Sequence, residues 1–237
     1  MKTVVVVPTY NERENIAKLI PNIFTIVPND LEMIVVDDNS PDNTAQIVTD
    51  WQTVYPQSLH LIKREKKSGL GSAYIAGFKK ALELGADLIM EMDADFSHNP
   101  NDIPKLISTC EEWADLAIGS RKISGGKIIG WNWRRKIMSD GAMFLSRLLL
   151  RLKTHDVTAG FRCYQRRALE AVGLDSITTN GYAFQEEMLY RLEKQGFTIK
   201  EIPVIFTDRK VGKSKLSNRD IGEFFLTILK LKLKRYD

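Results

Sequence analysis

The hydrophobic residues in the first half of the chain fall into short apolar runs separated by amphipathic stretches. The runs typical of buried strands are Thr3–Val7, Met33–Asp37, Leu59–Lys63, Asp87–Met92 and Asp115–Gly119. Apolar residues at helical spacing predict helices over Glu12–Ile26, Asn43–Val54, Leu70–Leu84 and Ile103–Glu112. This alternation predicts an α/β fold with a mainly parallel central sheet and helices on both faces.

The regular alternation ends in the middle of the chain. The later pattern predicts a helix over Lys136–Leu152, short strands with a helix over Phe184–Lys194, and a last amphipathic helix over Asp220–Lys234. No repeat, low-complexity tract or linker interrupts the sequence. We therefore expect one continuous domain over residues 1–237.

The composition is that of a folded globular protein. The 237 residues are 43% hydrophobic and 27% charged, which supplies a core and excludes a disordered chain, a collagen-like repeat and a disulfide scaffold. Cys110 and Cys163 lack metal-ligand spacing, so we expect reduced thiols. The apolar start at Val4–Val7 has no signal-peptide features, and no stretch approaches ~18 apolar residues. These features predict a soluble intracellular chain.

Polar residues follow three strands at the edge where a parallel sheet binds its ligands. The segments are Pro8–Glu12, Asp37–Ser40 and Asp93–Asp95. Asp93 and Asp95 are alternate residues after a strongly apolar strand, so both can reach one Mg²⁺ or Mn²⁺ shared with substrate phosphates. In the alternative interpretation Asp95 caps the next turn and Asp93 is solvated, because a bare Asp-x-Asp is common by chance.

Two further motifs have more than one interpretation. In Asp37–Asp42, either Ser40 or Asp42 can cap the next helix, but a carboxylate there can equally accept hydrogen bonds from a ribose or a base. Gly69-Leu70-Gly71 resembles the start of a dinucleotide fingerprint, yet Tyr74 occupies the place of the third glycine. A dehydrogenase is therefore disfavoured, and we expect these glycines to serve packing.

Basic residues are concentrated in two stretches without any carboxylate, residues 121–136 and 209–219. A charge run is usually a solvated face, but two such stretches beside acidic strand ends favour counter-charges for a diphosphate and a second phosphate group. Lys+Arg exceed Asp+Glu by only 34 − 30 = 4. Because the acidic strand ends would also repel a phosphate backbone, we expect no nucleic-acid binding.

Several segments form a recognisable set when taken together. They are Val7–Glu12, Val36–Asp42, Lys67–Tyr74, Met92–His98, Gly119–Arg121, Gly130-Trp131, Arg134–Ser139, Phe184-Gln185, Asp208-Arg209 and Gly212–Leu216. This set resembles glycosyltransferase family two, with its GT-A fold, and within it the catalytic subunits of dolichyl-phosphate mannose synthases. The resemblance runs in order over nearly the whole chain.

The resemblance implies a metal-dependent enzyme of the dolichyl-phosphate β-D-mannosyltransferase type, which moves mannose from GDP-mannose to a polyprenyl (dolichyl) phosphate with inversion. The implied donor-binding residues are Pro8, Tyr10, Glu12, Val36, Asp38, Asp93, Ala94, Asp95, Arg121, Arg209 and Lys215. The implied ligands of Mg²⁺ or Mn²⁺ are Asp93, Asp95 and Ser97, where Ser97 replaces a glutamine frequent in relatives. The implied catalytic residues are Asp93, Asp95, Arg121, Arg209 and Lys215, which would stabilise the leaving diphosphate.

The acceptor side needs no general base, because a phosphate monoester with a second pKa near ~6 is already ionised at neutral pH. None of His60, His98 and His155 lies in a motif that calls for a base. The residues that we expect at the acceptor phosphate are Arg134, Arg135 and Ser139, on a basic loop facing the open side of the site. Their alternative role is that of surface charges beside a membrane.

A lipid acceptor implies contact with a membrane surface. The last helix has an apolar stripe and a basic end, so it either lies on an anionic surface or covers the sheet. Ile128, Ile129, Trp131 and Trp133 form a second apolar group that we expect to be exposed. We predict a cytoplasmic protein, peripheral on the cytosolic face of a membrane (endoplasmic reticulum in a eukaryote, plasma membrane in a prokaryote). A small membrane-anchoring subunit is a candidate partner.

Two other functions stay open at this point. A polyprenyl-phosphate glucosyltransferase, or another transferase that uses a UDP-sugar, would share the fold, because the sequence does not distinguish guanine from uracil. The second is a noncatalytic GT-A binding subunit, against which the intact Asp93, Asp95, Arg209 and Lys215 argue. We expect residues 1–120 to form the nucleotide-sugar-binding half, and residues 121–237 the acceptor-side half with its C-terminal helix.

Overall fold

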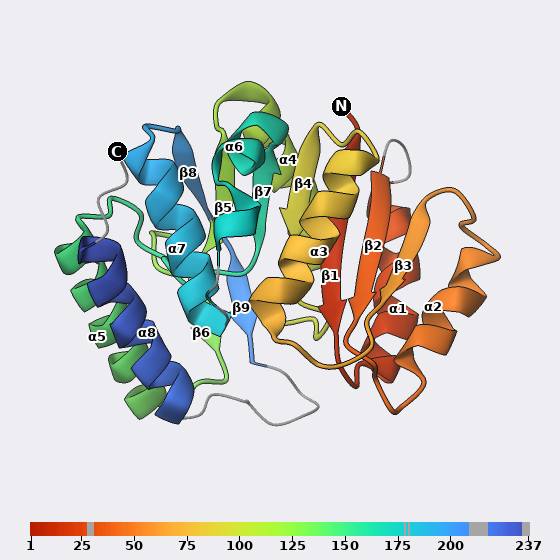
Figure 1. The fold of residues 1–237 in the computed structure, drawn as a ribbon, viewed down its shortest axis with the longest axis horizontal. Helices are drawn as coiled ribbons and strands as arrows, with labels where there is room; N and C mark the ends of the chain where they lie inside the picture. The colour runs from red at the N-terminus through yellow and green to blue at the C-terminus, as the bar shows by residue number, and fades with distance from the viewer. Residues whose placement is uncertain (28–30, 178, 180, 209–217, 234–237) are drawn as a thin grey trace.

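One large sheet runs through the middle of the molecule (Figure 1). The computed structural model describes residues 1–27, 31–177, 179, 181–208 and 218–233. Within them the sheet has seven strands, in spatial order β3 (Leu59–Lys63), β2 (Leu31–Asp37), β1 (Thr3–Thr9), β4 (Leu88–Glu91), β7 (Arg162–Gln165), β5 (Leu116–Ser120) and β8 (Ile199–Pro203). All neighbours pair in parallel except β7, which lies antiparallel between β4 and β5. The predicted α/β fold with a mainly parallel sheet is confirmed.

Each face of the sheet has its own hydrophobic core, because successive side chains of a strand point to opposite faces. Along β1, Val4 and Val6 face one core, and Val5 and Val7 face the other. The first core includes α3 (Leu70–Glu83), α6 (Arg166–Ala171) and α7 (Gly181–Lys194); the second includes α1 (Arg13–Ile26), α2 (Thr44–Gln52) and α4 (Ile103–Glu112). Burial on both faces explains why these strands appear in the sequence as continuous apolar runs.

The second half of the chain adds a small sheet and a pair of helices (Figure 1). β6 (Lys127–Ile129) pairs in parallel with β9 (Ile205–Thr207), and α5 (Trp133–Leu150) packs beside α8 (Asn218–Leu233). Two 3₁₀ turns, η1 (Pro100–Asp102) and η2 (Leu174–Ser176), precede α4 and α7. Within the described ranges, every helix is too short or too polar to cross a bilayer.

The basic stretch 121–136 differs from the predicted loop. It contains β6, and α5 begins at Trp133 rather than Lys136, because the Asn132 side chain accepts a hydrogen bond from the Arg135 amide at 2.8 Å and caps the helix. The expectation that Ile128 is exposed is wrong: the residue is only 9% exposed, because alternate residues of β6 face inward and it pairs with the buried Phe206 of β9. Trp133 is exposed, as expected, at 66%.

Candidate active site

The carboxyl ends of β1 and β2 are joined by a compact set of hydrogen bonds. Asp37 is fully buried and accepts hydrogen bonds from the Thr9 hydroxyl (3.1 Å), the Ser40 amide (2.9 Å) and the Ser40 hydroxyl (2.6 Å). Asp42 accepts hydrogen bonds from the amides of Thr44, where α2 begins, at 3.0 Å and of Arg13, where α1 begins, at 3.1 Å. Asp37 therefore stabilises the turn after β2, and Asp42 caps the start of α2, as this motif predicts.

Asp38 lies at the same edge, where the sequence predicts a donor pocket. Its carboxylate forms an ion pair with Arg64 (2.9 Å) and accepts a hydrogen bond from the Ser68 amide (3.2 Å). The Lys67 ammonium lies 4.0 Å from the centre of the Tyr10 ring. Sequence reasoning gave no role to Arg64, and it included Lys67 only in the family resemblance, although the basic residues Arg64, Lys66 and Lys67 directly after β3 were a signal.

Three other residues of the predicted donor pocket, Pro8, Glu12 and Val36, belong to the same edge of the sheet. Pro8 is half-buried at the end of β1, and the Glu12 carboxylate accepts a hydrogen bond from the Asn15 amide group at 2.7 Å. The Val36 side chain is fully buried in the core beneath α3, so only the backbone of this residue lies at the edge.

The Asp93-Ala94-Asp95 turn begins two residues after the last residue of β4. Both aspartates are half-buried, and Ala94 is buried between them. The Tyr74 hydroxyl donates to Asp93 Oδ1 at 3.4 Å, and the Ser97 amide donates to Asp95 Oδ1 at 2.9 Å. Asp95 thus caps its turn, as the alternative interpretation predicted. Ser97 is buried, and its carbonyl accepts a hydrogen bond from the Thr207 amide of β9 at 3.0 Å.

A buried ionic group lies beneath this turn. Glu91, the last residue of β4, is fully buried 3.4 Å from the Arg162 guanidinium of β7 and accepts a hydrogen bond from Tyr164 at 3.3 Å. Burial raises the pKa of Glu91 to about 7, against the opposing effect of Arg162. Arg162 also donates to the Ala159 and Gln185 carbonyls at 2.8 and 2.9 Å. This arginine therefore connects β4, the loop before β7 and the start of α7.

Arg121, at the end of β5, is held by Asp156. The guanidinium makes two hydrogen bonds to this carboxylate (2.7 and 2.6 Å) and one to the Thr158 hydroxyl (3.0 Å); Arg121 and Asp156 are buried, and Thr158 is half-buried. Burial alone would raise the pKa of Asp156, but Arg121 outweighs it and holds the pKa below its usual value. Arg121 thus lies near the site with its guanidinium already bound to protein.

The histidine nearest this region is not a general base candidate. His98 is buried with its ring 5.0 Å from the Phe161 ring and 5.3 Å from the Phe206 ring. Burial and the charge of Arg121 lower the pKa of His98 to about 4. The imidazole is therefore neutral and packed between aromatic rings at physiological pH.

The predicted acceptor residues lie at the start of α5. One guanidinium nitrogen of Arg135 donates to both carboxylate oxygens of Asp208 (3.0 and 3.2 Å), and the guanidinium lies 4.0 Å from the centre of the Trp131 ring. Arg134 is exposed beside Trp133, and Ser139 is half-buried in the next turn. Arg209 and Lys215 lie outside the described residues.

β9 connects the acidic turn to these basic residues. The Thr207 amide binds the Ser97 carbonyl, and the next residue, Asp208, holds Arg135. Among the described residues no group of three or more His, Cys, Asp or Glu side chains could hold a metal by itself. A carboxylate pair and basic side chains therefore lie at the carboxyl edge of an α/β sheet, where such sheets bind their ligands.

Comparison with known proteins gives the family. The pattern of glycosyl transferase family 2 matches residues 4–173. The chain is 41% identical over 222 residues to polyprenol monophosphomannose synthase of Mycolicibacterium smegmatis (94% of this chain, 83% of that protein). It is 40% identical over 228 residues to undecaprenyl-phosphate mannosyltransferase of Micrococcus luteus (96% and 93%).

A solved structure shares the fold. Glucosyl-3-phosphoglycerate synthase from Mycobacterium tuberculosis, in complex with Mn²⁺, UDP and glucosyl-3-phosphoglycerate, matches 97% of this chain and 79% of its own, with a TM-score of 0.66 and 18% identity. The chain therefore belongs to glycosyl transferase family 2 and is a glycosyltransferase with a GT-A fold. The predicted family and fold are confirmed.

Proposed function

We propose that this glycosyltransferase moves mannose from GDP-mannose to the phosphate of a polyprenol such as dolichol, with inversion, giving polyprenyl-phosphate mannose. The names of the two curated relatives support a polyprenyl phosphate acceptor and a mannosyl group. One structural observation carries the proposal: the Ser97–Thr207 hydrogen bond and the Asp208–Arg135 ion pair connect the predicted cation turn and one predicted acceptor residue to neighbouring residues, the last of β9 and the one that follows it.

The cation site of the proposal is the turn after β4. Asp93, Asp95 and Ser97 would hold Mg²⁺ or Mn²⁺, and their oxygens are the hard ligands that both ions prefer. Two carboxylates are too few to complete the coordination, which leaves positions for the donor's phosphates. The bound cation would neutralise charge that develops on the leaving diphosphate. We assign Arg121, Arg209 and Lys215 to the same leaving group.

The donor and acceptor sides divide along the sheet edge. The nucleoside is assigned to Pro8, Tyr10, Glu12, Val36 and Asp38, at the ends of β1 and β2. The acceptor phosphate is assigned to Arg134, Arg135 and Ser139 on α5. An oxygen of the ionised acceptor phosphate bonds to the anomeric carbon while the bond to GDP breaks. Because that phosphate carries no proton at the attacking oxygen, the chain has only to orient it.

The outer surface of α5 and α8 supports a lipid acceptor. Its exposed apolar residues, called here the apolar face, are Trp133, Ile137, Met138, Phe144, Leu148, Phe225, Leu226 and Leu229. Exposed apolar patches flanked by basic residues are typical of surfaces that bind anionic membranes. We propose that the protein is peripheral on the cytosolic face of a membrane, with a small membrane-anchoring subunit as a candidate partner.

A transfer assay tests the proposal. Purified protein is incubated with a polyprenyl phosphate, Mg²⁺ or Mn²⁺, and either GDP-[¹⁴C]mannose or UDP-[¹⁴C]glucose, and labelled lipid is extracted. The proposal expects labelled polyprenyl-phosphate mannose from GDP-mannose alone, and no product after chelation of the metal. Product from the UDP-sugar instead would establish the alternative glucosyltransferase. Absence of product with every donor would favour a noncatalytic binding subunit.

A further inference from the structure

Asp93 and Asp95 are oriented by different kinds of partner. Asp95 is held by the amide of Ser97, two residues further along the same turn. Asp93 accepts a hydrogen bond from the Tyr74 hydroxyl, which belongs to α3 and is 19 residues away in the chain. Because this partner comes from a distant helix, the packing of α3 contributes to the orientation of Asp93.

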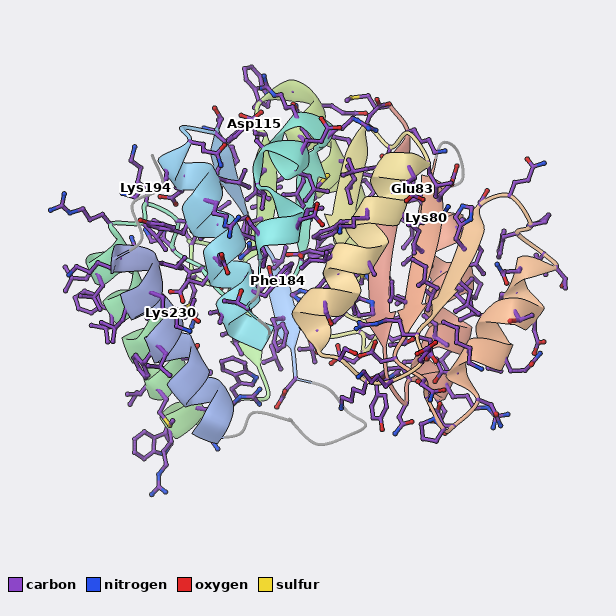
Figure 2. All side chains as sticks on the ribbon, viewed as in Figure 1. Lys80, Glu83, Asp115, Phe184, Lys194 and Lys230 are labelled. Carbon is purple, nitrogen blue, oxygen red and sulfur yellow. The ribbon has the colours of Figure 1, made fainter. Side chains whose placement is uncertain are left out.

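The ring of Tyr74 is locked in place. It is fully buried and stacks on Phe78 (5.7 Å between centroids) and Phe184 (5.9 Å). Figure 2 labels Phe184 between α7 and α3, so the ring of Tyr74 is held by its own helix and by the helix beside it. A tyrosine fixed in this way presents its hydroxyl at one position, with little rotational freedom to lose when Asp93 is bound.

Two glycines set how closely α3 approaches its neighbours. A Cβ atom at Gly77 would lie 2.2 Å from Val6 Cγ1 of β1, and one at Gly71 would lie 2.6 Å from the Thr179 carbonyl oxygen. Tyr74 lies midway between them on the buried side of the helix. The missing side chains therefore bring α3 near enough for the Tyr74 hydroxyl to reach Asp93.

We propose that Tyr74 is a positioning residue that aims the Asp93 carboxylate at the divalent cation of the donor complex. The inference rests on the proposed function, because it assumes that Asp93 binds this cation. Hydrogen-bond partners of metal-binding side chains fix ligand orientation, and removing one typically weakens metal binding by roughly 10–100-fold. Tyr74 itself touches neither cation nor sugar in this assignment.

The test compares two variants that each lose one buried hydroxyl. Tyr74→Phe removes the hydroxyl that donates to Asp93. Tyr164→Phe removes another buried hydroxyl, which contacts Glu91 and Arg162. Mn²⁺ binding is measured by electron paramagnetic resonance in the presence of saturating GDP. GDP binding without metal, measured by calorimetry, gives the concentration of folded protein, to which each Mn²⁺ affinity is normalised.

We expect Tyr74→Phe to weaken Mn²⁺ binding roughly tenfold, and Tyr164→Phe to change it less than about twofold. The Mn²⁺ concentration for half-maximal transfer should rise in parallel, with an unchanged KM for polyprenyl phosphate. Equal Mn²⁺ affinities for Tyr74→Phe and the wild type, or equal losses in both variants, would overturn the inference. A wild type that binds no Mn²⁺ overturns it too. A wild type that binds Mn²⁺ but transfers no mannose refutes only the proposed function.

Discussion

At the scale of single residues, the carboxylates of this protein are distinguished by their surroundings. Asp156 is buried but paired with Arg121, which keeps its pKa low. In Glu91 the cost of burying the charge outweighs the nearby Arg162, and in Glu186 no nearby cation among the described residues opposes that cost. Burial therefore raises their pKa values to about 7 and about 8. Asp93 and Asp95 are only half-buried, at the edge of the sheet. Among these carboxylates the last two are partly accessible to solvent, as the proposed cation site requires.

Asp95→Asn removes one negative charge from the proposed cation site. The amide oxygen can still accept the Ser97 hydrogen bond, so we expect the fold and the thermal midpoint to be retained. Turnover should fall by at least about a hundredfold, because the cation loses a charged ligand. Steady-state transfer at saturating Mg²⁺ checks this, with Asp50→Asn on the exposed face of α2 as the control. Wild-type rates in Asp95→Asn would refute the assignment of Asp95.

Arg134→Ala tests the acceptor side. Arg134 is exposed near the start of α5, so its removal should leave the fold intact while raising the KM for polyprenyl phosphate roughly tenfold. The KM for the sugar nucleotide should stay unchanged. Lys136→Ala, two residues further along the same helix and also exposed, is the matched control. A change confined to the donor KM would remove Arg134 from the acceptor site.

The buried Glu186 predicts a pH dependence of the free energy of unfolding, which Glu186→Gln should remove. Glu186 of α7 is fully buried, with one oxygen bonded to the Ser146 hydroxyl of α5 and the other without a partner among the described residues. Its folded pKa of about 8 lies above the unfolded value of 4.5, so the folded state holds an extra proton between them. Its contribution to stability is therefore fully present below about pH 4.5 and is lost as the pH rises toward 8.

The Gln variant mimics the protonated carboxyl at every pH. We expect its free energy of unfolding to match the wild type near pH 5 and to exceed it by roughly 2–4 kcal/mol near pH 8, as urea unfolding would measure. Glu83→Gln, at an exposed site, should show no such divergence. A constant difference across this pH range would mean that Glu186 does not titrate as stated.

At the scale of elements, α3 shows a packing role that the sequence predicted. Gly69-Leu70-Gly71 begins this helix, with Gly69 at a φ of 98° and Gly71 against α7. The interpretation of these glycines as packing residues rather than a dinucleotide fingerprint is confirmed. Tyr74, which breaks the fingerprint, faces Asp93. The residue that departs from the dinucleotide fingerprint is thus the one that contacts Asp93 of the proposed cation site.

Gly77→Ala and Gly141→Ala form a matched pair of helix substitutions. At Gly77 the new methyl group would overlap Val6, so we expect the protein to lose about 1–3 kcal/mol of stability. At Gly141 of α5 nothing lies within 4 Å of the new atom, and the higher helix propensity of alanine should add about 0.5–1 kcal/mol. Urea denaturation measures both. Equal effects would mean that α3 does not lie this close to β1.

At the scale of the whole molecule, α5 connects the apolar face to the proposed acceptor site. This helix carries the proposed acceptor residues at its start and exposed apolar residues along its length. Figure 1 shows α5 and α8 side by side at one end of the molecule, away from α1 and α2. A membrane bound by this face would therefore bring a lipid phosphate close to Arg134.

Vesicle binding tests this orientation. Phe144 and Leu148 are 65% and 63% exposed, one helical turn apart on α5. Replacing both by serine should weaken binding to vesicles of anionic phospholipid at least about tenfold, because two apolar side chains no longer bury in the bilayer. Trp113→Ser is the control: Trp113 is 70% exposed but lies two residues before Asp115, which Figure 2 labels at the top of the molecule, away from α5. Equal vesicle affinity in the wild type, the double serine variant and Trp113→Ser would show that the apolar face does not bind the membrane.

The sequence by itself determined the elements and the motifs, because hydrophobic periodicity and turn chemistry act between near neighbours. Every predicted strand and helix of the first half exists, with ends shifted by at most two residues. The turn after β4, the caps after β2 and the packing glycines of α3 also follow from local pattern. These features are enough to assign the fold class and the edge that carries the site.

Tertiary structure decided which distant residues meet. The antiparallel insertion of β7, the Arg121–Asp156 pair and the Tyr74–Asp93 contact have no local signature. The Arg135–Asp208 pair spans 73 residues and depends on β6 pairing with β9. Such contacts form because whole elements bury their apolar faces together, and the position of each polar partner is a consequence of that packing.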